Sequence, residues 1–348
     1  MGMALPEPGS SRRNAKRLWL RMGVSAALLA VLVFKISSEN IVPSHPTAGT
    51  FAFLVAGLLL MCGSFVLAAW RWQLVLAVFG AHIPMRVLFK HYLAGQFVGN
   101  VLPSTIGGDV LRVSRVSKDV GASDVAFASV MLERLTGFVA LPLLTLVGFI
   151  ARPDLLQGRA WVAVIIAAGT VGVLLLVMTL AGSPHLAGRF AEHENWMRYI
   201  GIIHIGVDRL RRDPRDAAAA LFAAVSYQVA VIGAIYCAVH VIGLRIPNGA
   251  VLAFVPAVAI AQVLPISVGG LGVREGLLAF FLHSLGVPTG QAVAVGLVWY
   301  AMTLLVSLLG APAFAVGHRR PTVVASTTGD VTARPAAQRA DAARREAS

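Results

Sequence analysis

Apolar residues in this chain gather into long runs that polar loops separate. Runs of about 20 apolar residues are long enough to cross a bilayer as a helix, and they occupy residues 18–36, 50–69, 125–150, 160–181, 217–242 and 291–316. A helix satisfies all of its backbone hydrogen bonds internally, which is required where no water is present. The pattern therefore predicts an all-α polytopic membrane protein with six full transmembrane helices.

Two further apolar segments are interrupted by proline and paired glycine, and they resemble each other. The first reads Val101-Leu-Pro-Ser-Thr-Ile-Gly-Gly-Asp-Val-Leu-Arg112, and the second reads Val263-Leu-Pro-Ile-Ser-Val-Gly-Gly-Leu-Gly-Val-Arg274. At one constant offset the matched positions are Pro103 with Pro265, Gly107 and Gly108 with Gly269 and Gly270, and Arg112 with Arg274. Broken hydrophobic segments at corresponding places in two halves point to a transporter binding site.

We predict that each interrupted segment forms a re-entrant helical hairpin. The arms on either side of the first break cover 92–101 and the stretch after Gly108, and those of the second cover 251–264 and 273–283. Each arm is shorter than the roughly 20 residues of a full span. Irregular backbone at membrane depth must be buried in protein or line a cavity. Full spans in place of the hairpins are the alternative.

The basic residues set the predicted orientation. Lys and Arg cluster at 12–21, at 183–215 and at 318–320, and the positive-inside rule places these clusters in the cytoplasm. Both termini are then cytoplasmic, and each half (about 18–150 and 160–318) holds three full spans and one hairpin. An odd number of spans inverts the second half, so we expect an inverted repeat whose first hairpin opens to the cytoplasm and whose second opens outward.

Several smaller basic or aromatic features fit the same orientation. Trp70 and Trp72 flank Arg71, which is typical of the membrane interface. Arg115 and Lys118 are interpreted as ordinary positive-inside residues. Residues 196–210 have the pattern of an amphipathic helix that lies on the membrane surface.

Composition supports the membrane interpretation and excludes other classes. The chain is 57% hydrophobic and 13% charged, whereas soluble domains carry about 25% charged residues. Membrane topology explains the net charge of +13, so nucleic acid is not expected as a partner. Segments 1–17 and 319–348 are polar and predicted to be disordered tails. Cys62 and Cys237 lie in apolar runs, and no metal-ligand or cofactor motif occurs, so neither a metal nor a cofactor is expected.

Charged side chains within or beside the apolar segments are the candidate chemistry. The helix that begins after each glycine pair would point its N-terminus, which attracts anions, into the protein. Asp109 is placed as an N-cap of the first such helix, and the planar fork of arginine matches phosphate oxygens. The candidate residues for binding a lipid headgroup are Arg112, Arg274, Asp109, Glu133, Arg134 and Glu275. The alternative is structural ion pairs, because an unpaired charge in the membrane costs about 2.5–3.5 kcal/mol on insertion scales.

Three stretches carry a resemblance to a known family. They are Asn100-Val-Leu-Pro-Ser-Thr-Ile-Gly-Gly-Asp-Val-Leu-Arg112, Glu133-Arg-Leu-Thr-Gly137 and Leu264-Pro-Ile-Ser-Val-Gly-Gly-Leu-Gly-Val-Arg-Glu-Gly276. Over about residues 15–318 the chain resembles the lysylphosphatidylglycerol synthase transmembrane family, also called the flippase-like domain. The resemblance implies an integral inner-membrane protein that handles lipid. In the name-giving members this domain moves aminoacylated phosphatidylglycerol between leaflets, and a separate cytosolic domain makes that lipid. We expect a stand-alone member without the synthase domain, because too little sequence follows Val316.

Three functions are compatible with these features. The leading one is a lipid translocator that binds the headgroup between the hairpins while the tails stay in the bilayer. An accessory subunit that presents lipid to a separate glycosyltransferase or lipid synthase is the alternative. An enzyme that uses Glu133 and Asp109 as acid and base is disfavoured, because no closely spaced carboxylate pair or metal cluster supports it. The lipid stays open among phospholipid, glycolipid, polyprenyl-linked and hopanoid classes.

Overall fold

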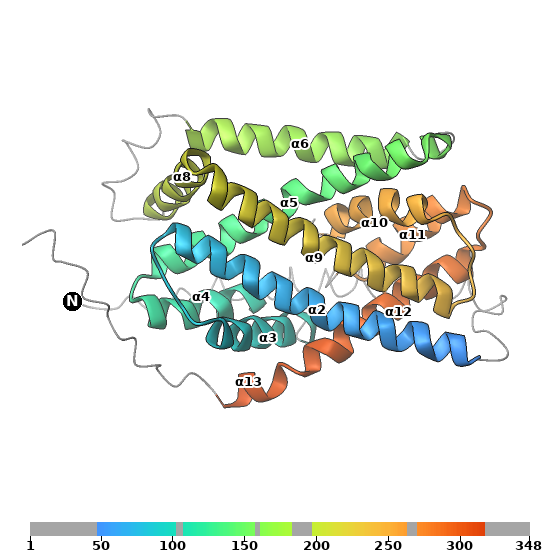
Figure 1. Cartoon of the computed structure of the whole chain (residues 1–348), viewed down its shortest axis with the longest axis horizontal. Coiled ribbons are helices and arrows are strands. Elements are labelled where there is room, and N and C mark those ends of the chain that lie inside the picture. Colours follow the sequence, from blue (N-terminus) through green and yellow to red (C-terminus); the bar gives the residue numbers. More distant parts are fainter. Residues whose placement is uncertain (1–46, 102–106, 157–160, 183–196, 263–269, 317–348) are drawn as a thin grey trace, which may run out of the picture. The chain divides into compact units, whose positions relative to one another are not determined.

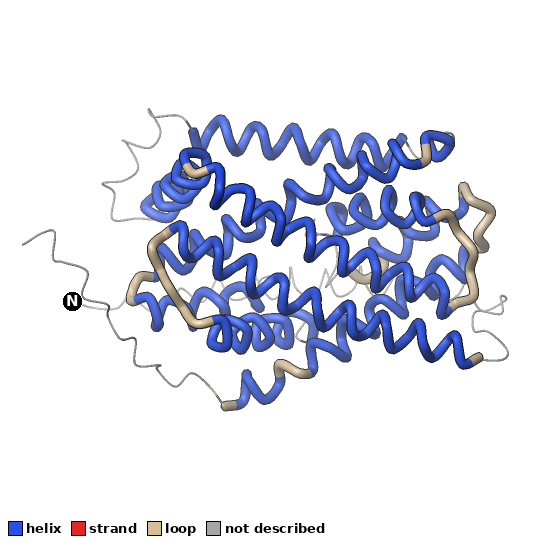
Figure 2. Tube along the Cα trace, viewed as in Figure 1, coloured by secondary structure: helices blue, strands red, loops and turns tan. Residues whose placement is uncertain are grey.

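The computed structural model describes residues 47–101, 107–156, 161–182, 197–262 and 270–316. Within these ranges the chain is helical and contains no strand (Figure 2). The elements are α2 (Ala48–Val78), α3 (Met85–Val101), α4 (Gly107–Val120), α5 (Ser123–Ala151), η1 (Pro153–Leu156), α6 (Trp161–Gly182), α8 (Met197–Arg212), α9 (Pro214–Val241), α10 (Asn248–Gln262), α11 (Val273–His283), α12 (Thr289–Leu308) and α13 (Ala311–Ala315). The chain divides into two compact units, Met1–His318 and Arg319–Ser348, and all of these elements belong to the first.

Four of the described helices are long and apolar enough to cross a membrane. They are α2, α5, α9 and α12, and each lies where the sequence predicts a span. A fifth predicted span, 160–181, corresponds to α6, of which Trp161–Leu175 is a shorter apolar stretch. The first predicted span, 18–36, lies outside the described residues. The protein is therefore a helical polytopic membrane protein, and the number of six full spans stays a prediction.

Helix α5 lies at the centre of the helix packing. In Figure 1, α2 and α9 run side by side along most of their length, and α5 crosses them and contacts both. α6 and α10 also pack on α5. One close approach is at Gly148 of α5, where an added Cβ would collide with the backbone of Ala253 on α10. Helices approach this closely in membranes where small residues line the contact.

Two helices flank the central residues of each copy of the repeat. These helices are α3 and α4 in the first copy and α10 and α11 in the second. Pro103, Pro265 and Gly269 lie outside the described residues, whereas Gly107 and Gly108 begin α4 and Gly270 has a φ of +76°. All four helices have fewer than the roughly 20 residues of a full span. The re-entrant arrangement and its inverted symmetry stay predictions.

Helix α2 does not end where the sequence suggests. The predicted span stops at Ala69, but the helix continues to Val78 because the residues after Trp72 are mostly apolar and favour helix. Arg71 and Trp72 consequently lie inside the helix and are buried in protein, at 6% and 0% exposure. The interpretation of Trp70, Arg71 and Trp72 as an interfacial pattern did not anticipate this burial.

The last predicted span is likewise two helices instead of one. α12 ends at Leu308 and α13 begins at Ala311. Pro312 lacks the backbone N–H that would continue the first helix. Gly310 lies so close to Leu93 of α3 that an added Cβ would collide with its carbonyl oxygen. The chain therefore turns at this point.

Two arginines from the basic segments bind the ends of helices. Arg115 is buried, and its Nη1 and Nη2 donate to the carbonyls of Ala313 (2.9 Å) and Phe314 (3.4 Å) in α13. Arg115 thus also contacts protein, and its interpretation as a positive-inside residue stays a prediction. The predicted amphipathic segment forms α8, whose Arg209 donates to the carbonyl of Val78 (3.0 Å) at the end of α2. Cations at these positions complement the partial negative charge of a helix C-terminus.

Candidate functional site

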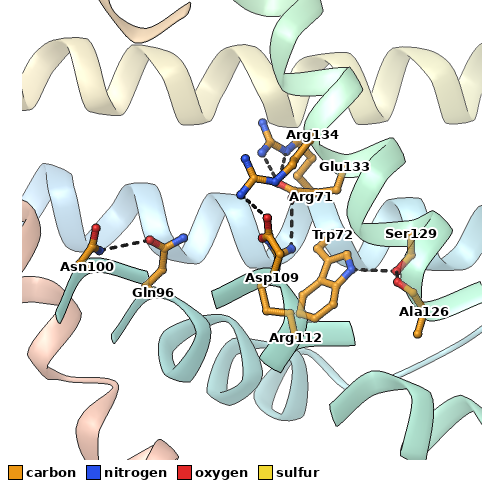
Figure 3. A network of polar contacts seen from close by, with 10 residues as sticks. All are labelled: Arg71, Trp72, Gln96, Asn100, Asp109, Arg112, Ala126, Ser129, Glu133 and Arg134. Atoms are coloured by element: carbon orange, nitrogen blue, oxygen red, sulfur yellow. Dashed lines mark hydrogen bonds and ion pairs between the residues drawn. The ribbon is translucent and has the colours of Figure 1, made fainter. Parts of the chain in front are cut away.

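Five charged side chains from three helices converge beside the first break of the repeat. Figure 3 shows Arg71 of α2, Asp109 and Arg112 of α4, and Glu133 and Arg134 of α5 directed toward one another. Four of these are predicted site residues, and the structure brings them together. Arg71 is the member that the sequence interpretation missed.

Glu133 is the acceptor that joins two of the arginines. Its Oε1 accepts a hydrogen bond from Arg71 Nε at 3.0 Å and a second, short one from Arg71 Nη2. Its Oε2 accepts from Arg112 Nη2 at 3.1 Å. The residue is 2% exposed. One buried carboxylate of α5 thus connects α2 and α4 through charge-assisted hydrogen bonds.

Asp109 is the second carboxylate of the cluster. Its Oδ1 lies 3.4 Å from Arg112 Nη1, and its Oδ2 pairs with Arg134 Nη2. Because α4 begins at Gly107, Asp109 lies within the first helical turn and points to the arginines. The prediction that Asp109 is the N-cap is therefore wrong. Three guanidinium groups face two carboxylates, so the cluster carries one positive charge in excess.

Aromatic rings hold two of the arginines in place. The guanidinium carbon of Arg112 lies 4.2 Å from the ring centre of Trp72 and 4.9 Å from that of Tyr92. That of Arg71 lies 5.0 Å from the ring centre of Tyr227. Trp72 is itself fixed, because its Nε1 donates to Ser129 Oγ at 3.1 Å. Each desolvated cation–π contact contributes about 2 kcal/mol or more.

An open cleft of about 960 Å³ lies against one side of the cluster. Arg71, Asp109 and Arg134 line this cleft, but Arg112 and Glu133 do not. The side chain of Arg134 is 40% exposed. The remaining lining residues are mainly apolar or neutral: Val110, Val113, Ser114, Ser117, Ser123, Phe127, Met131, Gly137, Phe138, Leu141, Tyr227, Gln228, Val231, Ala259, Gln262 and Trp299.

Arg71 has one buried donor nitrogen without a hydrogen-bond partner. Its Nη1 makes no hydrogen bond with any of the described residues. The group lies beside Gly137 of α5, where an added Cβ would be 2.9 Å from it. A glycine at this position therefore leaves room for the guanidinium. A buried donor without a partner is costly, so this nitrogen is well placed to receive an anionic group.

Arg274 and Glu275 form a separate pair on α11. Arg274 Nε and Nη2 donate to Glu275 Oε1 at 2.9 Å and 2.6 Å, and Glu275 Oε2 accepts from the backbone nitrogen of Gly272 at 2.7 Å. The rings of Trp299 and Tyr300 lie 5.2 Å and 5.0 Å from the guanidinium carbon. Among the described residues, no ion pair joins this pair to the first cluster. The geometry fits the structural alternative, and a role in headgroup binding stays a prediction.

These features are those of a multi-pass membrane protein with a polar site. Apolar helices surround buried charges that lie beside an open cleft, as in multi-pass membrane proteins whose intramembrane charges mark a binding site or pathway. The family model of the lysylphosphatidylglycerol synthase TM region matches residues 18–310. The chain belongs to this family. No significant match to a curated protein is found.

Proposed function

We propose that this protein is a flippase-like lipid carrier of the inner membrane. It binds a lipid with an anionic headgroup in the cleft and moves or presents it between leaflets. The observation that carries the proposal is the charge at the base of this cleft: a donor of Arg71 without a partner and the partly exposed guanidinium of Arg134. Membership of a family of lipid-handling membrane domains supports it.

The lipid phosphate would bind between Arg71 and Arg134. Arginine presents several donors in a planar fork, and phosphate oxygens accept from such a fork in pairs. Asp109 already occupies one side of Arg134, so the incoming phosphate takes over part of the role of that carboxylate. The cluster's single excess positive charge matches the charge of a phosphodiester.

The lipid tails would follow the apolar wall of the same cleft. Val110 and Val113 of α4 and Phe127, Met131 and Phe138 of α5 supply apolar surface next to the arginines. Val110 is 60% exposed, so this wall continues onto the outer face of the helices. A headgroup can then sit among polar groups while its chains stay in a hydrocarbon environment.

Movement would use the two halves of the chain. We propose six full spans and two re-entrant hairpins in halves of about 18–150 and 160–318, with both termini in the cytoplasm. Rocking of inverted halves about a central site exposes that site to one side and then to the other. The headgroup would be carried by this rearrangement without chemical change.

The test uses the purified full-length chain in liposomes with fluorescent phosphatidylglycerol as the probe. Loss of fluorescence to an external quencher reports arrival in the outer leaflet. Arg134→Ala should slow this movement about tenfold or more, since a charge-assisted hydrogen bond contributes about 1.5–3 kcal/mol. Arg134→Lys should restore it only in part, because lysine keeps the charge without the fork.

The matched control is Arg152→Ala. Arg152 is exposed and pairs with Asp154 away from the cleft, so its loss should leave movement unchanged. Equal rates for Arg134→Ala and the unmodified protein would contradict the proposal. Binding of phosphatidylglycerol that depends on Arg134, but without movement, would support the accessory subunit instead.

A further inference from the structure

We propose that the cleft selects lipids whose headgroup is, apart from its phosphate, uncharged and rich in hydroxyl groups, and that it disfavours cationic headgroups. This inference rests on the proposed function and names the substrate class of the same site. The lipid proposed for this chain therefore differs from lysylphosphatidylglycerol, the aminoacylated lipid in the name of its family.

Among its described lining residues, the cleft offers a cationic headgroup no free carboxylate. Of the described residues that line the cleft, Arg71, Arg134 and Asp109 carry charge. Asp109 is already shared between Arg112 and Arg134. A lysyl or other amino headgroup would therefore bring its ammonium next to two guanidinium groups without a carboxylate of its own. Like charges at this range repel by an amount that lowers binding.

Neutral polar side chains also line the cleft. Gln228 of α9 and Gln262 of α10 line the cleft, as do Ser114 and Ser117 of α4. The side-chain amide of Gln228 makes no hydrogen bond with another described residue, and that of Gln262 makes one long hydrogen bond, from Nε2 to the carbonyl of Val258 at 3.4 Å. Each amide offers two donors and one acceptor oxygen. Hydroxyl groups donate and accept at once, so they can use both sides of such an amide.

Two aromatic side chains contribute to the same lining. The rings of Tyr227 and Trp299 line the cleft. Each ring also lies near an arginine, Tyr227 near Arg71 and Trp299 near Arg274. Their π faces are thus already paired with protein cations and are less available to an ammonium group of the ligand. Their edges and apolar surface remain suited to the carbon skeleton of a polyol.

The experiment compares three lipids on the detergent-solubilised full-length chain by native mass spectrometry. The headgroup of phosphatidylglycerol has a phosphate and a neutral diol. That of phosphatidylethanolamine has a phosphate and one ammonium group, and that of lysyl-phosphatidylglycerol has a phosphate and two ammonium groups. We expect affinity to fall in that order, by about tenfold or more between the first and the last. Equal or tighter binding of lysyl-phosphatidylglycerol would overturn the inference.

A charge placed in the cleft should change the preference. Gln262→Glu, and separately Gln228→Glu, would each supply a carboxylate for the ammonium groups. Each variant should reduce the ratio of the affinities for phosphatidylglycerol and lysyl-phosphatidylglycerol at least several-fold. Gln291→Glu is the matched control, because Gln291 lies in the first turn of α12 and does not line the cleft. An unchanged preference in both folded cleft variants would count against the inference.

Alanine variants cover the case in which a buried glutamate prevents folding. Gln228→Ala and Gln262→Ala should weaken phosphatidylglycerol binding more than phosphatidylethanolamine binding, and the reverse order would overturn the inference. Failure of the proposed function looks different: Arg134→Ala would then leave the binding of all three lipids unchanged. If Arg134→Ala weakens binding while the three lipids bind equally in the unmodified protein, only the selectivity inference fails.

Discussion

At the scale of residues, the three arginines of the cluster have different tasks. Arg112 is 3% exposed, lies between two aromatic rings and donates to Glu133, so it holds α4 against α5. Arg71 and Arg134 line the cleft, and Arg71 Nη1 has no hydrogen-bond partner among the described residues. Removing one partner of a buried pair costs about 3–5 kcal/mol. Loss of Arg112 should consequently reduce folding, whereas loss of Arg134 should reduce binding.

Substitution of Asp109 should strengthen lipid binding, whereas loss of Arg134 should weaken it. Because its carboxylate occupies Arg134, it competes with a lipid phosphate for the same donors. Asp109→Asn removes this competitor, and the loss of its negative charge raises the net charge of the cluster by one. We expect phosphatidylglycerol to bind roughly three- to tenfold more tightly, within the range of one charge-assisted hydrogen bond, as measured by native mass spectrometry.

The control for this prediction is Asp154→Asn. Asp154 is exposed and pairs with Arg152, so it should have no effect on lipid affinity. Weaker binding by Asp109→Asn in a folded protein would show that Asp109 positions Arg134 for the lipid instead of competing with it.

The residues of the site could be found from the sequence only where they carry charge. Asp109, Glu133 and Arg134 stand in or beside apolar segments, where a charge is expensive and needs a partner. Arg71 also carries charge, but the predicted span ends before it, at Ala69, and its partner Glu133 lies 62 residues later. Tyr227 and Gln228 were missed for a different reason: neutral residues cost little in a helix and give no such signal.

At the scale of elements, apolar runs located the helices well and their ends less well. α11 has the predicted bounds, Val273–His283, because a glycine precedes it and a loop follows. α2 and α12 differ at their C-termini. In α2, the charge of Arg71 suggested a helix end, but the helix continues past it. Between α12 and α13, the apolar run suggested one continuous helix, but the first helix ends within that run. Hydropathy does not register close backbone contacts such as that of Gly310.

The contact of α5 with α10 gives the prediction at this scale. Gly148→Ala would place a methyl group against the backbone of Ala253 and force the two helices apart. Overpacking of this kind costs about 1–3 kcal/mol. Thermal unfolding in detergent should show a lower midpoint. Gly169→Ala on α6 is the control, since open space surrounds it, and it should be neutral or stabilise by about 0.5–1 kcal/mol. Equal midpoints for the two variants would contradict this account of the packing.

At the scale of the whole molecule, the orientation in the membrane is the open question that one experiment answers. The basic clusters at 12–21, 183–215 and 318–320 predict that both termini are cytoplasmic. Reporter fusions after Ser348 should be active only as cytoplasmic reporters, and those within 37–49 only as external ones. An external C-terminus would remove the basis for the inverted repeat.

The bridge that Glu133 makes between Arg71 and Arg112 has a consequence for biosynthesis. The ribosome delivers α2 to the translocon before α5 exists, so Arg71 enters the bilayer without its counter-ion, at a cost of about 2.5–3.5 kcal/mol. A nascent chain stopped at residue 101 should therefore insert α2 less completely than one stopped at residue 151. Glycosylation mapping of the two chains measures the difference. Glu133→Gln in the longer chain should abolish the increase in the inserted fraction of α2. An unchanged increase would mean that α5 assists insertion by packing alone.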